Sequence, residues 1–313
     1  MLVSPLPGVE PSELLRLLRE LKSQVDNLHA VGGGRGFAGS LQRMWEYLEW
    51  VDETARRLNS TVGADTADRL VRTRGYEVLL GNSVALGGTF GGDIYPERLL
   101  NTMVTNELTA RSDALARAMT ELEHAKQWRG WSWLVVLDTN VYLEHERKLE
   151  ELDLAELLEA GEQPVHLLVP IAVVDELDKA KRNDKTRYRG AYSLAHIIKA
   201  LDEVDGVLRE ADPGSGPDPQ ARGQITVEIV SDPPGHRRMP DPDDEIVDRA
   251  LAVQLRAGAK VTMITYDTGM SWRATDAGLT VVKLDFDPGA EPPPSSRRTS
   301  RRTRRAASEP SRN

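Results

Sequence analysis

The sequence predicts an α/β protein whose mostly parallel, doubly wound sheet is flanked by helices and preceded by a mainly helical region. The apolar run at residues 134–137 has the length and valine content of a strand buried on both faces. From residue 131 onward, runs of this kind alternate with helical segments, as in right-handed βαβ units. The other runs are residues 165–169, 225–230, 261–264 and 279–284.

Residues 10–128 are predicted to be mostly helical. Leucines recur at helical spacing over residues 14–28, and a second amphipathic segment spans residues 40–58. A third long helix is expected over residues 96–128. Between these helices, the glycine-rich stretch at residues 76–94 favours a loop or a short hairpin.

Composition narrows the classes of function. The length of 313 residues suggests two domains, and the formal net charge of −9 argues against a protein that coats nucleic acid through bulk charge. The absence of cysteine excludes disulfides, thiolate zinc sites and cysteine nucleophiles. The six histidines show no paired spacing, which argues against a metal site built from histidine.

The texture of the sequence divides the chain into three parts. Residues 1–130 form the helical region, to which no chemistry is assigned, and residues 131–287 form the α/β domain. Residues 288–313 are rich in Arg, Pro and Ser and almost free of apolar side chains, so we expect them to be disordered.

Acidic residues follow two of the predicted strands directly. Asp138 comes immediately after the first strand, and Asp267 lies just beyond the fourth. In a doubly wound sheet whose halves diverge from the first strand, these strands are neighbours, and ligands bind at their carboxyl edge. Glu176 follows the second strand, and Asp243 begins the helix before the fourth. The sequence thus predicts that four carboxylates share one crevice.

Carboxylates that share a crevice repel one another unless a cation neutralises them. Oxygen ligands without sulfur or histidine select Mg²⁺ or Mn²⁺, and two such ions about 4 Å apart would suit in-line attack by water on a phosphodiester. Asp243 also has a structural explanation, because acids are favoured in the first turn of a helix, and Glu176 can be a solvated helix residue. Asp138 is harder to explain in this way, since an aspartate directly after a buried strand needs partners.

Four segments of this region resemble the signature segments of the PIN domain nucleases. They are Asp138-Thr139-Asn140-Val141, Pro170-Ile171 with Glu176-Leu177-Asp178-Lys179, Asp243-Asp244-Glu245-Ile246, and Thr265-Tyr266-Asp267. The resemblance covers about residues 131–287 and is strongest to the PIN domains associated with PhoH-type ATPases. In these, a segment similar to Met270-Ser271-Trp272-Arg273-Ala274 follows the last acid.

The resemblance implies a PIN-like fold and metal-dependent cleavage of single-stranded RNA. Asp244 competes with Asp243 for one position, but Asp243 stands three residues before Ile246, as in the D-x-x-I pattern of the family. The catalytic acids that hold Mg²⁺ or Mn²⁺ would be Asp138, Glu176, Asp243 and Asp267. The supporting polar residues near the metal would be Thr139, Asn140, Asp244 and Thr265.

Basic residues near the acids are candidates for phosphate contacts. The tail arginines are equally compatible with a sliding contact to nucleic acid and with a role in solubility. A run just after Glu176 contains Lys179, Lys181, Arg182, Lys185 and Arg187, and Arg273 is a further candidate. The tail contributes Arg297, Arg298, Arg301 and Arg302.

These features favour a metal-dependent endoribonuclease, a hydrolase in which water is the nucleophile. A haloacid-dehalogenase-like phosphatase also has an aspartate at a strand end, but it needs a second acid two residues later, where this chain has Asn140. The alternative from another class is a non-catalytic RNA-binding or scaffold protein with a structural metal ion.

The remaining expectations concern partners and location. The helical region is a candidate site for a protein partner. The oligomeric state is left open, and the homodimers that PIN domains often form are an analogy only. Neither a signal peptide nor a membrane span is visible, because prolines interrupt the start of the chain and no long apolar run follows. We therefore expect a cytoplasmic protein without membrane contact.

Overall fold

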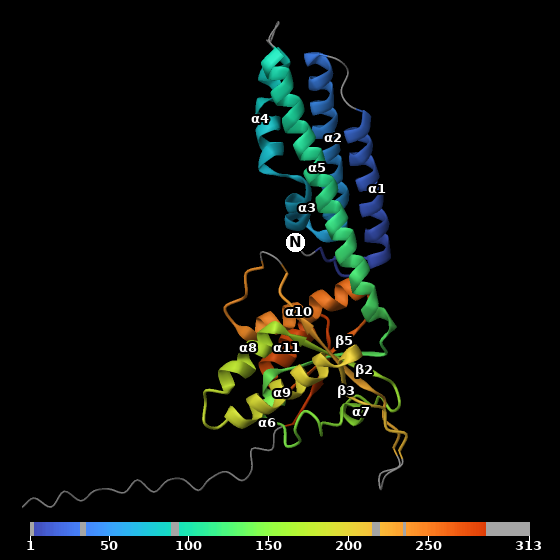
Figure 1. Cartoon of the computed structure of the whole chain (residues 1–313), viewed down its shortest axis with the longest axis vertical. Coiled ribbons are helices and arrows are strands. Elements are labelled where there is room, and N and C mark those ends of the chain that lie inside the picture. Colours follow the sequence, from blue (N-terminus) through green and yellow to red (C-terminus); the bar gives the residue numbers. More distant parts are fainter. Residues whose placement is uncertain (1–2, 32–35, 89–93, 215–219, 234–235, 286–313) are drawn as a thin grey trace, which may run out of the picture.

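A helical region stands on one side of an α/β region in the computed structural model, and the long helix α5 leads from one to the other (Figure 1). Each region has its own hydrophobic cluster of buried side chains. The structure describes residues 3–31, 36–88, 94–214, 220–233 and 236–285.

The helical region consists of long helices packed side by side along their length (Figure 1). Leu14, Leu18, Leu21 and Val25 have no exposed surface, which is the outcome that their helical spacing predicts. The elements are α1 (Pro11–Val31), α2 (Phe37–Val62), α3 (Ala64–Val71), α4 (Arg74–Gly88), α5 (Ile94–His124) and the 3₁₀ helix η1 (Ala125–Gly130).

The loop or hairpin expected over residues 76–94 is wrong, because α4 extends through most of this stretch. Glycine disfavours a helix by about 1 kcal/mol relative to alanine, but packing overrides that cost. Tyr76, Leu79 and Ser83 recur at helical spacing and are buried, so one face of α4 is held by contacts with α2 and α5. This spacing is the signal that the glycine content obscured.

The sheet has six strands in the order β3-β4-β2-β1-β5-β6, and every pairing is parallel except that of β3 with β4. The predicted α/β fold, a mostly parallel PIN-like sheet flanked by helices after a helical region, is confirmed. The strands are β1 (Trp133–Leu137), β2 (Val165–Pro170), β3 (Val207–Arg209), β4 (Ile225–Val230), β5 (Val261–Thr265) and β6 (Thr280–Lys283). The helices are α6 (Thr139–Glu144), α7 (Leu154–Leu157), α8 (Ile171–Ala180), α9 (Arg187–Asp202), the 3₁₀ helix η2 (Val204–Gly206), α10 (Pro242–Ala257) and α11 (Thr268–Asp276).

The strand β1 lies at the point where the two halves of the sheet diverge. Leu134 pairs with His166 of β2 on one side and with Val261 of β5 on the other. The strands that precede Asp138 and Asp267 are therefore neighbours, as the doubly wound arrangement predicts. Ligands bind at this edge of open α/β sheets, so the sheet order places both acids where a site is expected.

Two local predictions in the α/β region differ from the structure. The sequence predicts a helix over about residues 189–208, but α9 ends at Asp202, and the short edge strand β3 follows it. A three-residue strand is too short to produce a periodic signal in sequence. The leucines between residues 149 and 158 predict a further helix, but only α7 forms there, and α6 begins directly after Asp138.

The joint between the two regions is made by η1 and the end of α10. Trp128 donates its indole N–H to Oε2 of Glu228 in β4 at 2.9 Å, and Arg129 Nε donates to the carbonyl of Ala257 at 2.6 Å. The guanidinium of Arg256 lies 5.5 Å from the centre of the Trp128 ring. The helical region therefore contacts the sheet through polar as well as apolar groups.

No helix among the described residues is both long and apolar enough to cross a membrane.

Replacing Leu167 with alanine should destabilise the fold by about 3 kcal/mol, because this β2 side chain has no exposed surface and its loss leaves a cavity. Urea unfolding measures the change. The matched control is Leu201→Ala in α9, where the side chain is 40% exposed, and it should change stability by less than about 0.5 kcal/mol. Equal effects of the two substitutions would contradict the packing of β2 at the centre of the sheet.

Candidate active site

Asp138 occupies the carboxyl end of β1 and is 2% exposed. Its backbone N–H donates to the carbonyl of Ile264 at 2.9 Å, which continues the pairing between β1 and β5. One carboxylate oxygen accepts a hydrogen bond from the hydroxyl of Thr265 at 2.7 Å. The sheet thus fixes both the main chain and the side chain of Asp138.

Thr265 connects Asp138 to Asp267. Its hydroxyl oxygen donates to Asp138 and also accepts the backbone N–H of Asp267 at 2.9 Å. The carboxylate of Asp267 in turn accepts the N–H of Met270 at 2.6 Å, so Asp267 caps α11. Because one hydroxyl contacts both residues, the two acids are held at a defined spacing across neighbouring strands.

Glu176 approaches from the second turn of α8. The hydroxyl of Thr139, directly after Asp138, donates to Oε2 of Glu176 at 2.6 Å. Thr139 is therefore next to Asp138 in the chain and hydrogen-bonded to Glu176, while its role as a support near a metal stays a prediction. Asn140 follows in the first turn of α6, and its main chain forms a hydrogen bond that lowers the pKa of Asp138.

Asp243 lies in the first turn of α10, where Asp241 caps the helix by accepting the N–H of Asp243 at 3.1 Å. The guanidinium of Arg273 on α11 donates to Oδ2 of Asp243 at 2.8 Å. The same guanidinium lies 3.2 Å from Asp244 and 3.8 Å from Asp241. Capping and ion pairing thus both act on this end of α10, and Asp244 shares the guanidinium of Arg273 with Asp243, while its predicted supporting role stays a prediction.

The four acids interact electrostatically. Burial raises the pKa of Asp138 to about 6, with further upward contributions from Asp243 and Glu176 against the hydrogen bond from Thr265. Burial also raises the pKa of Asp243, and Asp241, Asp267 and Glu176 add to this shift while Arg273 opposes it. The sheet edge therefore gathers the residues that the sequence predicts, and their negative charges are incompletely compensated.

The four acids, together with Thr139 and Thr265, are called the crevice below, and their donor atoms suit a hard divalent cation. The groups that converge are carboxylates and threonine hydroxyls, without sulfur or imidazole. A cation bound there would relieve the repulsion that raises the pKa of Asp138 and Asp243. The four acids of the crevice are not among the described residues whose ligand atoms all lie within 4.8 Å of one another.

The basic run predicted to contact phosphate lies at the end of α8, in the following loop and at the start of α9. Lys181 pairs with Asp178 at 2.6 Å, whereas Lys179, Arg182, Lys185 and Arg187 are exposed. Contact of these residues and of Arg273 with RNA stays a prediction, and the ion pairs of Arg273 are made with the acids of α10. The tail arginines Arg297, Arg298, Arg301 and Arg302 lie outside the described residues.

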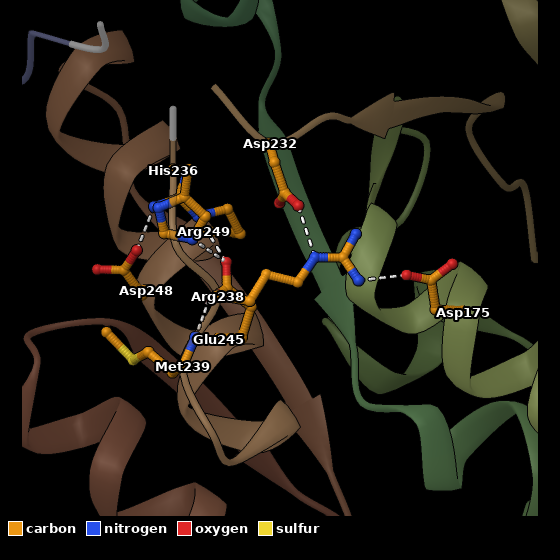
Figure 2. Close-up of polar contacts among 8 residues, drawn as sticks. All are labelled: Asp175, Asp232, His236, Arg238, Met239, Glu245, Asp248 and Arg249. Carbon is orange, nitrogen blue, oxygen red and sulfur yellow. Dashed lines mark hydrogen bonds and ion pairs between the residues drawn. The ribbon is translucent and has the colours of Figure 1, made fainter. Parts of the chain in front are cut away.

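A second polar cluster, which the sequence analysis misses, is built from the segment that follows β4 and from α10 (Figure 2). Asp232, His236 and Glu245 each offer one potential metal-ligand atom, and these atoms lie within 4.8 Å of one another. Two arginines already pair with this group: Arg238 lies 2.6 Å from Asp232, and Arg249 lies 3.3 Å from Glu245. A search for two histidines at helical spacing cannot find this cluster, because it contains one histidine and two acids that lie outside a common helix.

The chain has an open, mostly parallel sheet with carboxylates at its switch point. In α/β proteins of this class, ligands bind at the carboxyl edge of the sheet. Within this class, residues 135–285 match the family model of the PIN domain. PIN domains are generally metal-dependent nucleases. No curated protein and no solved structure matches the chain.

Replacing Asp138 with asparagine should stabilise the metal-free protein at neutral pH. The pKa of Asp138 rises from the usual 3.8 to about 6 on folding, so its contribution to stability is lost as pH rises from about 4 to about 6. Above pH 6 the folded protein holds an ionised, desolvated carboxylate, which costs about 3 kcal/mol. Urea unfolding in EDTA at pH 4 and pH 7.5 should show the stabilisation at pH 7.5 alone.

The matched control for this measurement is Asp276→Asn, because Asp276 is exposed near the end of α11. That variant should follow the parent at both pH values. A variant of Asp138 that gains no stability at pH 7.5 relative to pH 4 would show that the carboxylate is not desolvated in the folded state.

Proposed function

We propose that this protein is an endoribonuclease that uses Mg²⁺ or Mn²⁺ to hydrolyse phosphodiester bonds of single-stranded RNA. The observation that supports it best is the buried Asp138 at the sheet switch point, with the repulsion of Asp243 and Glu176 acting on it. The match of residues 135–285 to the PIN domain supports a nuclease-type fold. The substrate follows from the resemblance of the four signature segments to PIN nucleases.

The proposed roles follow from the positions of the acids. Asp138, Glu176, Asp243 and Asp267 would hold the cation, which would polarise a phosphoryl oxygen and lower the pKa of a water molecule. Thr265 holds Asp138, and Thr139 holds Glu176, so their oxygens are oriented before substrate arrives. No residue of the chain forms a covalent bond with the substrate in this scheme.

Cation binding and arginine pairing compete at Asp243. The ion pair with Arg273 supplies positive charge to Asp243, Asp244 and Asp241. We propose that a cation held by Asp243 would release the guanidinium of Arg273 for an RNA phosphate, since a guanidinium binds phosphate oxygens in the same bidentate way in which it binds carboxylates. This role would unite the position of Arg273 with its predicted contact to RNA.

The finer assignment to the PhoH-associated type of PIN domain is also proposed. It is supported by the Met270-Ser271-Trp272-Arg273-Ala274 segment, which lies in α11 directly after Asp267. In this arrangement Met270 and Ala274 are buried, while Arg273 points to the acids of α10. We expect the reaction to take place in the cytoplasm.

Substituting Asp138 with asparagine should lower the rate of RNA cleavage by more than about a hundredfold, because ligand loss exceeds the usual effect of losing a group that only orients a ligand. The assay follows a labelled, unstructured RNA with Mn²⁺ and, separately, with EDTA, which should abolish cleavage. Asp276→Asn is the control and should cleave at the parental rate. Cleavage by the Asp138 variant at that rate would show that the site is assigned wrongly.

Removing residues 288–313 tests the tail arginines. If they contact phosphate, the RNA affinity of the truncated protein should fall, and the slope of log K against log salt should decrease by about 0.7 for each lost contact. Cleavage at saturating RNA should be retained, because the acids are intact. An unchanged salt slope would assign the tail to solubility and leave residues 179–187 as the proposed phosphate contact.

A further inference from the structure

The chain between β4 and α10 links the two helices that bring Glu176 and Asp243 to the crevice. Glu176 is on α8 and Asp243 is on α10, and these helices contact each other. The described residues of this link, 231–233 and 236–241, are called the β4–α10 connection. Figure 2 shows side chains of the connection pointing to α8 on one side and to α10 on the other.

Arg238 joins the connection to α8. Its Nε lies 2.6 Å from Oδ2 of Asp232, and its NH1 donates to Oδ2 of Asp175. The hydrogen bonds to Asp175 and Asp232 raise the pKa of Arg238 above its usual range. Asp175 is the residue directly before Glu176, so this contact acts on the turn of α8 that holds a crevice acid.

Glu245 joins the same connection to α10. It is 1% exposed, and its Oε2 accepts the backbone N–H of Met239 at 2.9 Å. Its Oε1 lies 2.7 Å from Nε2 of His236 and 3.3 Å from Nε of Arg249. Glu245 stands two residues after Asp243, so the connection is fixed to the first turns of α10.

The two attachments oppose a repulsion inside the crevice. Glu176 and Asp243 carry carboxylates of like charge on two helices that contact each other, and like charges at close range repel. Arg238 and Glu245 tie both helices to one short segment without using an oxygen of Glu176 or Asp243. The positive charge of Arg238 thus acts outside the crevice and leaves the crevice carboxylates to the cation.

We propose that Arg238 is a positioning residue whose bond to Asp175 sets the separation of Glu176 and Asp243, and thereby the affinity of the crevice for a divalent cation. The inference rests on the proposed role of these two acids in holding the metal. It assigns a function to the second polar cluster that neither the PIN resemblance nor the acid pattern indicates.

The test measures Mn²⁺ binding to the full chain by electron paramagnetic resonance, with Asp138→Asn as the baseline for binding outside the crevice. Arg238→Ala should weaken binding about tenfold, the usual effect of removing a group that orients a metal ligand. Arg238→Lys should recover part of this loss, since lysine keeps the charge but not the two-sided geometry of arginine. Cleavage by Arg238→Ala should return toward the parental rate at saturating Mn²⁺.

Arg237→Ala is the matched control. Arg237 is the exposed neighbour of Arg238 and forms no hydrogen bond or ion pair among the described residues, so its removal changes the net charge equally without breaking the attachment. It should bind Mn²⁺ like the parent. Combining Arg238→Ala with Asp175→Asn should weaken Mn²⁺ binding no further than Asp175→Asn alone, because each change breaks the same contact between Arg238 and Asp175.

Two outcomes would overturn the inference. One is Mn²⁺ binding by Arg238→Ala equal to that of Arg237→Ala. The other is binding that survives in Asp138→Asn but is lost in His236→Gln, which would place the ion in the cluster of Asp232, His236 and Glu245. A parent that binds Mn²⁺ in the crevice but cleaves no RNA would refute the proposed function, whereas the affinity shift of Arg238→Ala would still support the positioning role.

Discussion

Repulsion among carboxylates at the carboxyl edge of β1 and β5 is the constraint to which the surrounding structure responds. Asp138 is buried there by the sheet itself, because it follows a strand covered on both faces. A buried carboxylate is tolerated only with hydrogen-bond partners, and Thr265 supplies one from the neighbouring strand. The same hydroxyl accepts the N–H of Asp267, so the pairing of β1 with β5 also determines the spacing of two acids.

The arginines that compensate these negative charges contact only some of the acids. Arg273 pairs with the acids at the start of α10, and Arg238 pairs with Asp175, the residue before Glu176. The inner carboxylate, Asp138, has no arginine or lysine hydrogen-bonded to it among the described residues and relies on hydroxyl and main-chain donors. Such an arrangement lowers the total repulsion without pairing the carboxylate of Asp138 with an arginine or a lysine.

The sequence predicts the sheet and the position of Asp138 at the end of its first strand, because both depend on local patterns. A buried run that ends in an aspartate is visible in a few residues, and the neighbourhood of β1 and β5 follows from the general order of doubly wound sheets. The helix α4 is not predicted because its glycines favour a loop, although Tyr76, Leu79 and Ser83 have helical spacing. Edge strand β3 was missed because three residues have no measurable period.

The second polar cluster could not be predicted for a different reason. Arg238 and Asp175 are 63 residues apart in sequence, and His236 and Glu245 are nine residues apart across a non-helical connection. No periodicity relates such pairs, because their contact depends on the path of the chain around the sheet edge. Charged residues of this kind appear in sequence as ordinary surface positions until the fold shows which of them share a neighbour.

The elements α5, η1 and β1 follow one another directly, so the long helix leads into the strand that ends at Asp138. The 31 residues of α5 span about 46 Å at 1.5 Å per residue. Trp128 binds η1 to β4, and Arg129 binds it to the end of α10, so the C-terminal end of α5 is anchored to the α/β region. A molecule that bound at the N-terminal end of α5 would therefore be held about the length of this helix away from the end of α5 that joins the α/β region.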